Sequence, residues 1–287
     1  MVYYGSIEAG GTKFVCAIGN EDAKVIERIS FPTTTPAKTL EKVFEFFDQY
    51  DLKAIGIGSF GPIDVNPKSE TYGYVTSTPK ISWQNFDFLG AVKHRYHMPV
   101  AWTTDVNAAA LGEQRLGAAQ GMNSCLYLTV GTGIGGGAVV LGKLLTGFSH
   151  PEMGHIIVPY HPEDSFEGVC PFHGDCLEGL AAGPAIEKRF GIKADQLDEE
   201  HIAWDFEAFY LAQAIVNYLL VLSPDKVILG GGVMKQTHLF PKIRAEVERL
   251  INGYVQLPHL NEFIVPPTLG DHAATIGCLI LAKEMKE

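Results

Sequence analysis

The 287-residue sequence is poor in charge and in cysteine, and it has no apolar run long enough to cross a bilayer. Only 19% of the residues are charged, and the formal net charge of −11 argues against a surface for nucleic acid or anionic membrane. The odd count of five cysteines disfavours a disulfide framework and fits a reducing compartment. The N-terminus lacks the basic and apolar regions of a signal peptide. We therefore expect a folded cytoplasmic protein.

A strand–turn–strand pattern occurs twice, more than a hundred residues apart. Residues 2–9 and 13–19 read as strands on either side of a glycine turn, and residues 124–130 and 134–142 repeat this arrangement. Each hairpin is followed by the start of a third strand. The repeat predicts two related lobes.

Helical and strand-like segments alternate through the rest of the chain, which is typical of an α/β protein. We expect an N-terminal α/β lobe over residues 1–118 and a C-terminal α/β lobe over residues 119–270. The final helix, over about residues 271–287, is expected to pack back on the first lobe.

Three glycine clusters are candidates for binding phosphate, at residues 10–12, 131–133 and 230–232. The segments 56–61 and 131–136 match GxGxxG, but neither runs from a strand directly into a helix, as a dinucleotide-binding loop must. The sequence also has no GxxxxGK[ST]. Two interpretations remain: hairpin turns whose backbone N–H groups approach a phosphate, or ordinary turns that bind nothing.

A loop rich in proline and glycine contains Cys170, His173 and Cys176. This spacing suits a structural zinc site with four ligands, and the histidines at 150, 155 and 161 are candidates for the fourth. The alternatives are a disulfide between the two cysteines or free surface residues.

Several acidic residues stand where an active site could form. Asp105 follows a predicted strand and precedes a predicted helix, the place where α/β sheets bind ligands, although it could also be a helix N-cap. Glu152, His155 and Glu178 could form a polar pocket that recognises several hydroxyls, or each could be a solvated or structural group.

Seven motifs, in this order, resemble the ROK family of repressors and sugar kinases and span nearly the whole chain. They are EAGGTK (8–13), GSFGP (58–62), TDVNAAALGE (104–113), TVGTGIGGG (129–137), PEMGH (151–155), CPFHGDCLEGLAAGPA (170–185) and ILGGGV (228–233). The first and sixth are most similar to the fructokinase branch. The resemblance implies a two-lobed, actin-like (ribonuclease H-like) ATPase fold with an interlobe cleft, and an ATP-dependent hexose kinase that forms fructose 6-phosphate.

The resemblance also implies residue roles. Asp105 would be the catalytic base, and Thr104, Glu152, His155 and Glu178 would bind the sugar. The zinc ligands would be His155, Cys170, His173 and Cys176, and Glu8 would belong to the shell of a Mg²⁺ ion bound with ATP. The residues implied for ATP binding are Gly10, Gly11, Thr12, Lys13, Gly131, Thr132, Gly133, Pro184, Gly231 and Gly232.

The sequence departs from the family pattern at three of these positions. Many members have Asp in place of Glu8, Asn in place of Thr104, and Cys in place of His173. The helix-turn-helix arm of the repressor members is not found before the first strand, so DNA binding is not expected; the resemblance suggests a homodimer. The alternatives are a kinase for glucose, mannose or N-acetylhexosamine, a sugar-sensing protein without turnover, and a metal-stabilised structural module.

Overall fold

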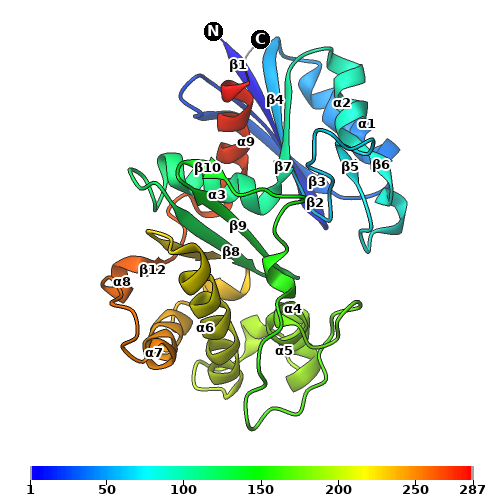
Figure 1. The fold of residues 1–287 in the computed structure, drawn as a ribbon. Helices are drawn as coiled ribbons and strands as arrows, with labels where there is room; N and C mark the ends of the chain where they lie inside the picture. The colour runs from blue at the N-terminus through cyan, green and yellow to red at the C-terminus, as the bar shows by residue number, and fades with distance from the viewer. Residues whose placement is uncertain (1, 286–287) are drawn as a thin grey trace. The chain divides into compact units, whose positions relative to one another are not determined.

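The computed structural model describes residues 2–285 and divides into two compact units (Figure 1). The first unit comprises Met1–Gly117, Leu144–Pro151 and Asp271–Glu287, and the second comprises Ala118–Lys143 and Glu152–Gly270. The C-terminal segment therefore belongs to the same unit as the N-terminal strands.

The first unit contains a five-stranded sheet with the order β3-β2-β1-β4-β7. β1 is antiparallel to β2 and parallel to β4, and β4 is parallel to β7. The glycine turn at residues 10–12 joins β1 to β2. The strands are β1 (Tyr3–Ala9), β2 (Lys13–Gly19), β3 (Val25–Pro32), β4 (Leu52–Ser59) and β7 (Val100–Thr104).

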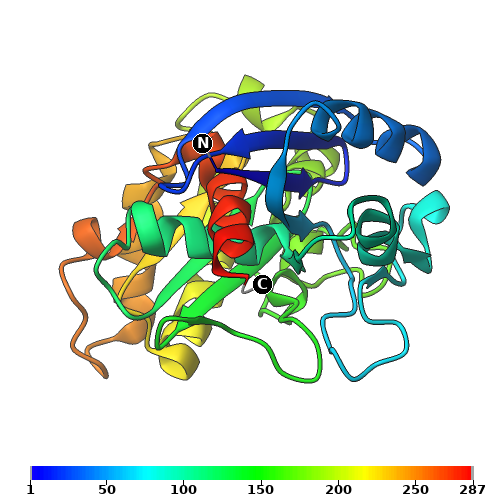
Figure 2. The same cartoon turned by 90° about the horizontal axis from the view of Figure 1, so that it is seen from above.

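Helices cover both faces of this sheet. α1 (Pro36–Phe47) and α2 (Phe88–Tyr96) share one aromatic-rich core with the strands, centred on Phe14 and Trp83. α3 (Asp105–Leu116) and α9 (Ala273–Glu284) contribute Leu111 and Leu279 to a separate core. Figure 2 shows α9, in red, beside the N-terminal strands.

The second unit repeats the topology of the first. Its sheet has the order β10-β9-β8-β11-β12, with β8 antiparallel to β9 and parallel to β11. The strands are β8 (Cys125–Val130), β9 (Ile134–Val140), β10 (Lys143–Leu144), β11 (Val227–Gly230) and β12 (Ile264–Val265). In both sheets, the hairpin of the first strand is extended on the other side by parallel strands, which confirms the predicted repeat.

Five helices complete the second unit: α4 (Leu177–Ala181), α5 (Gly183–Phe190), α6 (Ala203–Leu222), α7 (Leu239–Ile251) and α8 (Leu260–Phe263). By length and composition α6 could cross a membrane, but 61% of its apolar window is buried inside the protein, where it packs on α4 and α7. Residues such as Trp204 and Leu211 are fully buried on it, so α6 is the core helix of this unit.

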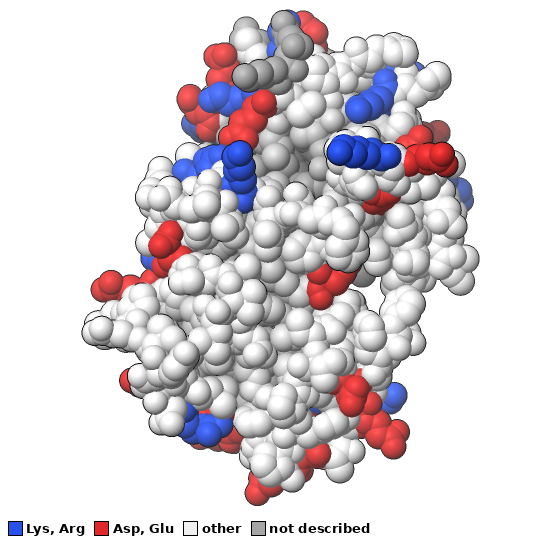
Figure 3. Space-filling model, viewed as in Figure 1, with Lys and Arg blue, Asp and Glu red and all other residues white. Residues whose placement is uncertain are grey.

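Shorter elements connect the main ones. They are β5 (Tyr74–Val75), β6 (Phe86–Asp87), and the 3-10 helices η1 (Ile81–Trp83), η2 (Met153–His155), η3 (Ala194–Gln196), η4 (Val233–Lys235) and η5 (Gly270–His272). On the face drawn in Figure 3, Lys and Arg side chains are scattered among Asp and Glu, and no continuous basic patch forms there among residues 2–285.

Two glycines allow the backbones of α3 and α9 to touch. A Cβ atom on Gly277 of α9 would lie 1.8 Å from the carbonyl oxygen of Ala108 in α3. A Cβ atom on Gly112 of α3 would lie 2.3 Å from the carbonyl oxygen of Ala273 in α9. Since backbone atoms cannot move aside like the end of a flexible side chain, this contact fixes α3, and with it Asp105 at its first position.

We expect Gly277→Ala to lower the free energy of unfolding by about 1–3 kcal/mol, because the added methyl group overpacks the α3–α9 contact. Gly→Ala in an unhindered helix would instead stabilise it by roughly 0.5–1 kcal/mol. Urea denaturation measures the difference. Gly147→Ala, where the nearest atom to the added Cβ lies 4.0 Å away, is the control and should change stability by less than about 0.5 kcal/mol. Stabilisation by Gly277→Ala would contradict the close contact.

Candidate functional site

Asp105 lies where β7 ends and α3 begins. It is the first residue of the helix, its side chain is partly buried, and its Oδ1 accepts a hydrogen bond from the Val106 N–H at 2.9 Å. The N-cap of α3 is Thr104, so the alternative in which Asp105 is the cap is wrong. A helix N-terminus interacts favourably with the negative charge of a carboxylate, and the carboxyl end of a parallel strand is where α/β sheets bind ligands.

Thr104 caps the helix with its side chain. Its Oγ1 accepts a hydrogen bond from the Asn107 N–H at 3.1 Å, and the Asn107 side-chain amide donates to Thr103 Oγ1 at 3.3 Å. The hydroxyl hydrogen of Thr104 is not used by this cap, so the contact with sugar predicted from the sequence stays a prediction. Asn107, which sequence reasoning did not single out, orders the turn that carries Asp105.

The first glycine turn follows β1. The Gly10 N–H donates to the Lys13 carbonyl at 2.9 Å, and a Cβ on Gly10 would lie 2.8 Å from that same oxygen. Thr33 holds the turn from outside, because its Oγ1 donates to the Gly10 carbonyl at 2.7 Å. Glycine is thus required at position 10 by the tightness of the turn itself, and phosphate binding by residues 10–13 stays a prediction.

Glu8 stands just before this turn, and its carboxylate accepts a hydrogen bond from Thr275 Oγ1 at 2.8 Å. Burial raises the pKa of Glu8, while the Thr275 hydrogen bond and the charges of Arg28 and Lys13 lower it. The negative charge of Asp271 also raises this pKa. Carboxylate oxygens are the ligands that Mg²⁺ prefers, and the place of Glu8 in the shell of this ion stays a prediction. Asp271 carries no local sequence signal, and sequence reasoning missed it.

The second and third glycine clusters meet in the second unit. The Gly131 N–H donates to the Gly133 carbonyl at 2.9 Å, and the Gly131 carbonyl accepts from the Gly183 N–H, at the start of α5, at 2.8 Å. Gly231 has φ = +94°, and a Cβ atom there would lie 2.4 Å from the Val130 carbonyl oxygen. The structure therefore brings together three predicted nucleotide-binding segments, namely residues 131–133, Gly183–Pro184 and residues 231–232.

Four predicted metal ligands form one cluster. The ligand atoms of His155, Cys170, His173 and Cys176 all lie within 4.8 Å of one another. His155 Nδ1 lies 3.4 Å from the Cys176 sulfur and 3.7 Å from the Cys170 sulfur, which is also 3.7 Å from His173 Nδ1. Zinc bonds of about 2.0–2.3 Å in tetrahedral geometry place ligand atoms roughly 3.3–3.8 Å apart. The two histidines and two thiols therefore fit a tetrahedral zinc ion.

The alternatives for this loop are resolved by the geometry. Both loop cysteines are free thiols, so the disulfide is wrong. His150 lies elsewhere, with its Nε2 accepting the Ile63 N–H at 3.1 Å, and His161 packs against Phe206 with ring centroids 4.6 Å apart. His155 is therefore the histidine that completes the cluster. The other three cysteines are buried, as expected for small core residues.

Glu178 joins the metal cluster to the second glycine turn. Its Oε2 accepts a hydrogen bond from the Ile134 N–H at 2.9 Å and would lie 2.5 Å from a Cβ on Gly133. Its Oε1 lies 4.0 Å from Nε2 of His155, whose Nδ1 faces the metal cluster. One carboxylate is thus held between a predicted phosphate turn and a predicted metal ligand.

Glu152 lies in the same neighbourhood, three residues before His155. Burial of the carboxyl group and, to a lesser extent, the negative charge of Glu178 raise the pKa of Glu152 to about 7. Two carboxylates and an imidazole that interact in this way offer both acceptors and donors, and such a group can bind adjacent hydroxyls of a sugar.

Comparisons with known proteins find relatives over nearly the whole chain. The ROK family profile matches residues 4–285. Over 279 residues the chain is 48% identical to a fructokinase of Pediococcus pentosaceus, with 97% of both chains covered. Over 288 residues it is 45% identical to a fructokinase of Streptococcus mutans serotype c, with 98% of both covered. The crystal structure of a ROK hexokinase from Thermus thermophilus has a TM-score of 0.80 and 26% identity, again covering 98% of both chains. The two-lobed α/β fold expected from the sequence is confirmed.

We expect the purified protein to contain about one zinc ion per chain, as a closed four-ligand site binds. Cys176→Ser should remove most of it, because a serine hydroxyl is a poor replacement for a thiolate ligand. His161→Gln is the control, since His161 lies outside the cluster, and should leave the zinc content unchanged. Elemental analysis measures both. Zinc loss in the His161 variant, or none in wild type, would contradict the site.

We expect Glu152→Gln to stabilise the protein in a pH-dependent way. The raised pKa means that folded Glu152 keeps its proton up to about pH 7, whereas the unfolded chain loses it near the ordinary value of 4.5. The stability that protonated Glu152 contributes is complete below pH 4.5 and lost as the pH rises to 7. The melting temperature of the variant should therefore exceed that of wild type by more at pH 7.5 than at pH 4.5. A difference independent of pH would contradict the raised pKa.

Proposed function

The chain belongs to the ROK family, and we propose that it is an ATP-dependent fructokinase that phosphorylates the 6-hydroxyl of fructose. One observation carries the choice of substrate: the 48% identity, over 97% of both chains, to a protein named fructokinase. The thermophilic ROK hexokinase with the same fold supports the broader class of sugar kinase. The geometry of the individual residues supports the roles proposed below.

Asp105 is proposed as the general base. Its partly buried carboxylate at the start of α3 would accept the proton of the sugar 6-hydroxyl as the oxygen attacks the γ-phosphorus of ATP. The new O–P bond forms while the bond between that phosphorus and the departing ADP oxygen breaks. The proton stays on Asp105 until solvent takes it up, so atoms and charge balance.

The glycine turns are proposed to hold the nucleotide. Backbone N–H groups of the turns at residues 10–13 and 131–133, other than those of Gly10 and Gly131, would face phosphate oxygens. Gly231 and Gly232, with Pro184 at the start of α5, would flank the adenosine. Lys13 would add a positive charge. A Mg²⁺ ion bound with ATP would neutralise negative charge on the transferred phosphoryl group. Glu8, with Asp271 nearby, would hold this ion.

The sugar is proposed to bind through Thr104, Glu152, His155 and Glu178. The carboxylates accept hydrogen bonds from hydroxyls, and the raised pKa of Glu152 leaves it able to donate as well near neutral pH. His155 presents Nε2 toward Glu178 while its Nδ1 faces the metal cluster. A bound zinc ion would then be structural, because it orients His155 and closes the loop that leads to Glu178.

The relatives' activity also supports proposals on the setting of the reaction. We expect the enzyme to be cytoplasmic, because ATP and hexoses are both present in the cytoplasm, and to form a homodimer in solution.

We expect Asp105→Asn to lower kcat with fructose by about 10²–10⁴-fold, because the amide keeps the shape of the side chain but cannot accept the proton. The Kd for fructose should change little. Asp87→Asn is a matched control: Asp87 also stands at the start of a helix, as the N-cap of α2, where its side chain accepts the Gly90 N–H at 2.8 Å. An asparagine caps equally well, so kcat should stay within about threefold of wild type. Coupled ADP-release kinetics and calorimetry measure these values.

The same assay, run on fructose, glucose, mannose and N-acetylhexosamines, tests the substrate. We expect the highest kcat/KM for fructose. A higher kcat/KM for another hexose would overturn fructose as the preferred substrate but would still support the assignment as a sugar kinase. Absence of ADP release with every sugar would contradict the enzyme, and a near-normal kcat in the Asp105 variant would contradict the base.

A further inference from the structure

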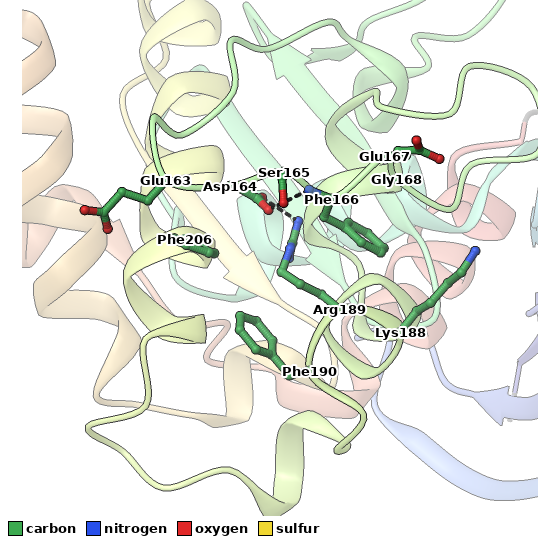
Figure 4. A pocket seen from close by; sticks show the side chains of 10 residues that line it. All are labelled: Glu163, Asp164, Ser165, Phe166, Glu167, Gly168, Lys188, Arg189, Phe190 and Phe206. Carbon is green, nitrogen blue, oxygen red and sulfur yellow. Dashed lines mark hydrogen bonds and ion pairs between the residues drawn. The ribbon is translucent and has the colours of Figure 1, made fainter.

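Arg189 lies in a hollow of about 510 Å³ on the second unit, outside the residues assigned above (Figure 4). The hollow is lined by the loop of residues 163–168 and by side chains of α5 and α6, among them Lys188, Phe190 and Phe206. Figure 4 shows the Arg189 side chain extending from α5 past Phe166 toward Asp164. Although the hollow is open to solvent, the charged groups of Arg189 and Asp164 are not, since their side chains are only 7% and 3% exposed.

Two polar contacts and the faces of aromatic rings hold the Arg189 guanidinium. Its Nη2 lies 3.0 Å from Asp164 Oδ2 and also donates to the Leu180 carbonyl at 2.8 Å. The group stacks on the Phe166 ring, 4.5 Å from its centroid. A lysine could not combine these contacts, because only a planar guanidinium offers donors at its edge while its face covers an aromatic ring.

Asp164 is the carboxylate that balances the charge of Arg189. It also accepts the Tyr210 hydroxyl at 2.7 Å and the Phe166 N–H at 3.0 Å. Glu207 is the other acid that interacts with Arg189, but complete burial raises the pKa of Glu207 far above its ordinary value. Removal of Arg189 would leave the Asp164 carboxylate buried without its counter-charge.

Along the chain, the two polar contacts of Arg189 lie on either side of the metal ligands in the loop of residues 159–176, which we call the metal loop. Asp164 precedes the three ligands Cys170, His173 and Cys176, and Leu180 follows them in α4. The last carbonyls of a helix have no donor within the helix, and Arg189 supplies one to this short helix of five residues. Glu178 belongs to the same helix, two residues before Leu180. Any shift of α4 therefore moves Glu178.

We propose that Arg189 is a positioning residue for sugar binding: its hydrogen bond to the Leu180 carbonyl holds α4 so that Glu178 meets the sugar. The proposal rests on the proposed function for the role of Glu178. The ion pair with Asp164 has a separate effect, which is to neutralise two buried charges and so keep the loop of residues 163–168 folded.

Two variants separate these effects. Arg189→Met removes both polar contacts and leaves Asp164 unpaired, whereas Arg189→Met/Asp164→Asn also removes the unpaired charge. An asparagine at 164 still accepts the Phe166 N–H through its one oxygen, and its amide N–H can donate to the Tyr210 hydroxyl oxygen in place of the bond that Asp164 accepts. Lys242→Met is the matched control, because Lys242 on α7 pairs with Asp205 on α6 at 2.7 Å in an exposed ion pair. The readouts are the Kd values for fructose and for a non-hydrolysable ATP analogue, the melting temperature, and hydrogen exchange of the α4 amides.

We expect Arg189→Met to raise the Kd for fructose by about tenfold or more, as the loss of an orienting contact behind a binding group typically does. The Kd for the nucleotide should change by less than about threefold, exchange at α4 should become faster, and the melting temperature should fall. The double variant should regain much of the melting temperature, while its Kd for fructose stays high. The control variant should match wild type in all four readouts.

Several results would overturn the proposal. If the double variant also regains the wild-type Kd for fructose, the unpaired charge and not the Leu180 contact caused the loss. If fructose and nucleotide affinity fall equally, Arg189 has only a general structural role. If wild type binds no fructose, the proposed function fails, and α4 exchange alone decides: faster exchange in both variants supports the positioning of α4, and unchanged exchange refutes it.

Discussion

The Glu178 carboxylate accepts the Ile134 N–H directly after the Gly131–Gly133 turn, and its other oxygen lies 4.0 Å from Nε2 of His155. Through Glu178, three segments with different structural requirements are linked: the Gly131–Gly133 turn, the metal loop and α4. The turn must expose backbone N–H groups, the loop must bring two histidines and two thiols together, and α4 must present a carboxylate. Gly133 permits the contact, because a Cβ there would lie 2.5 Å from Glu178 Oε2. The position of one side chain thus depends on the glycine turn as much as on the metal loop.

In the first unit the corresponding constraint is steric rather than polar. Asp105 is placed by the start of α3, and α3 is placed by backbone contact with α9, where Gly277 approaches Ala108. A glycine contact of this kind leaves no freedom to slide, since the atoms involved are main-chain atoms. The C-terminal helix is therefore part of the support for a residue more than 160 positions earlier in the chain.

Sequence patterns predicted the features that are local. The two hairpins were predictable because each strand–turn–strand signal spans fewer than twenty residues, and Cys170, His173 and Cys176 stand within seven residues of one another. Spacing alone left three histidines open for the fourth ligand. The family resemblance named His155, and the fold brings His155 to the cluster while His150 lies elsewhere. Asp271 near Glu8 and the Arg189–Asp164 pair could not be predicted, since neither has a periodic or spaced signal.

The loop of residues 159–176, which carries three of the four predicted metal ligands, has little secondary structure of its own to hold it. Between Pro159 and Cys176 the chain forms no helix or strand of its own, only single bridges such as Cys170 with Gly174. Backbone groups in such a segment cannot be satisfied by ladders, and few of its side chains reach a core. A zinc ion would fix the loop through its second half, at residues 170–176, and Arg189 fixes its first half through Asp164. The zinc ion and Arg189 thus stabilise different halves of the loop. Through its hydrogen bond to the Leu180 carbonyl, Arg189 also holds α4, the helix that carries Glu178.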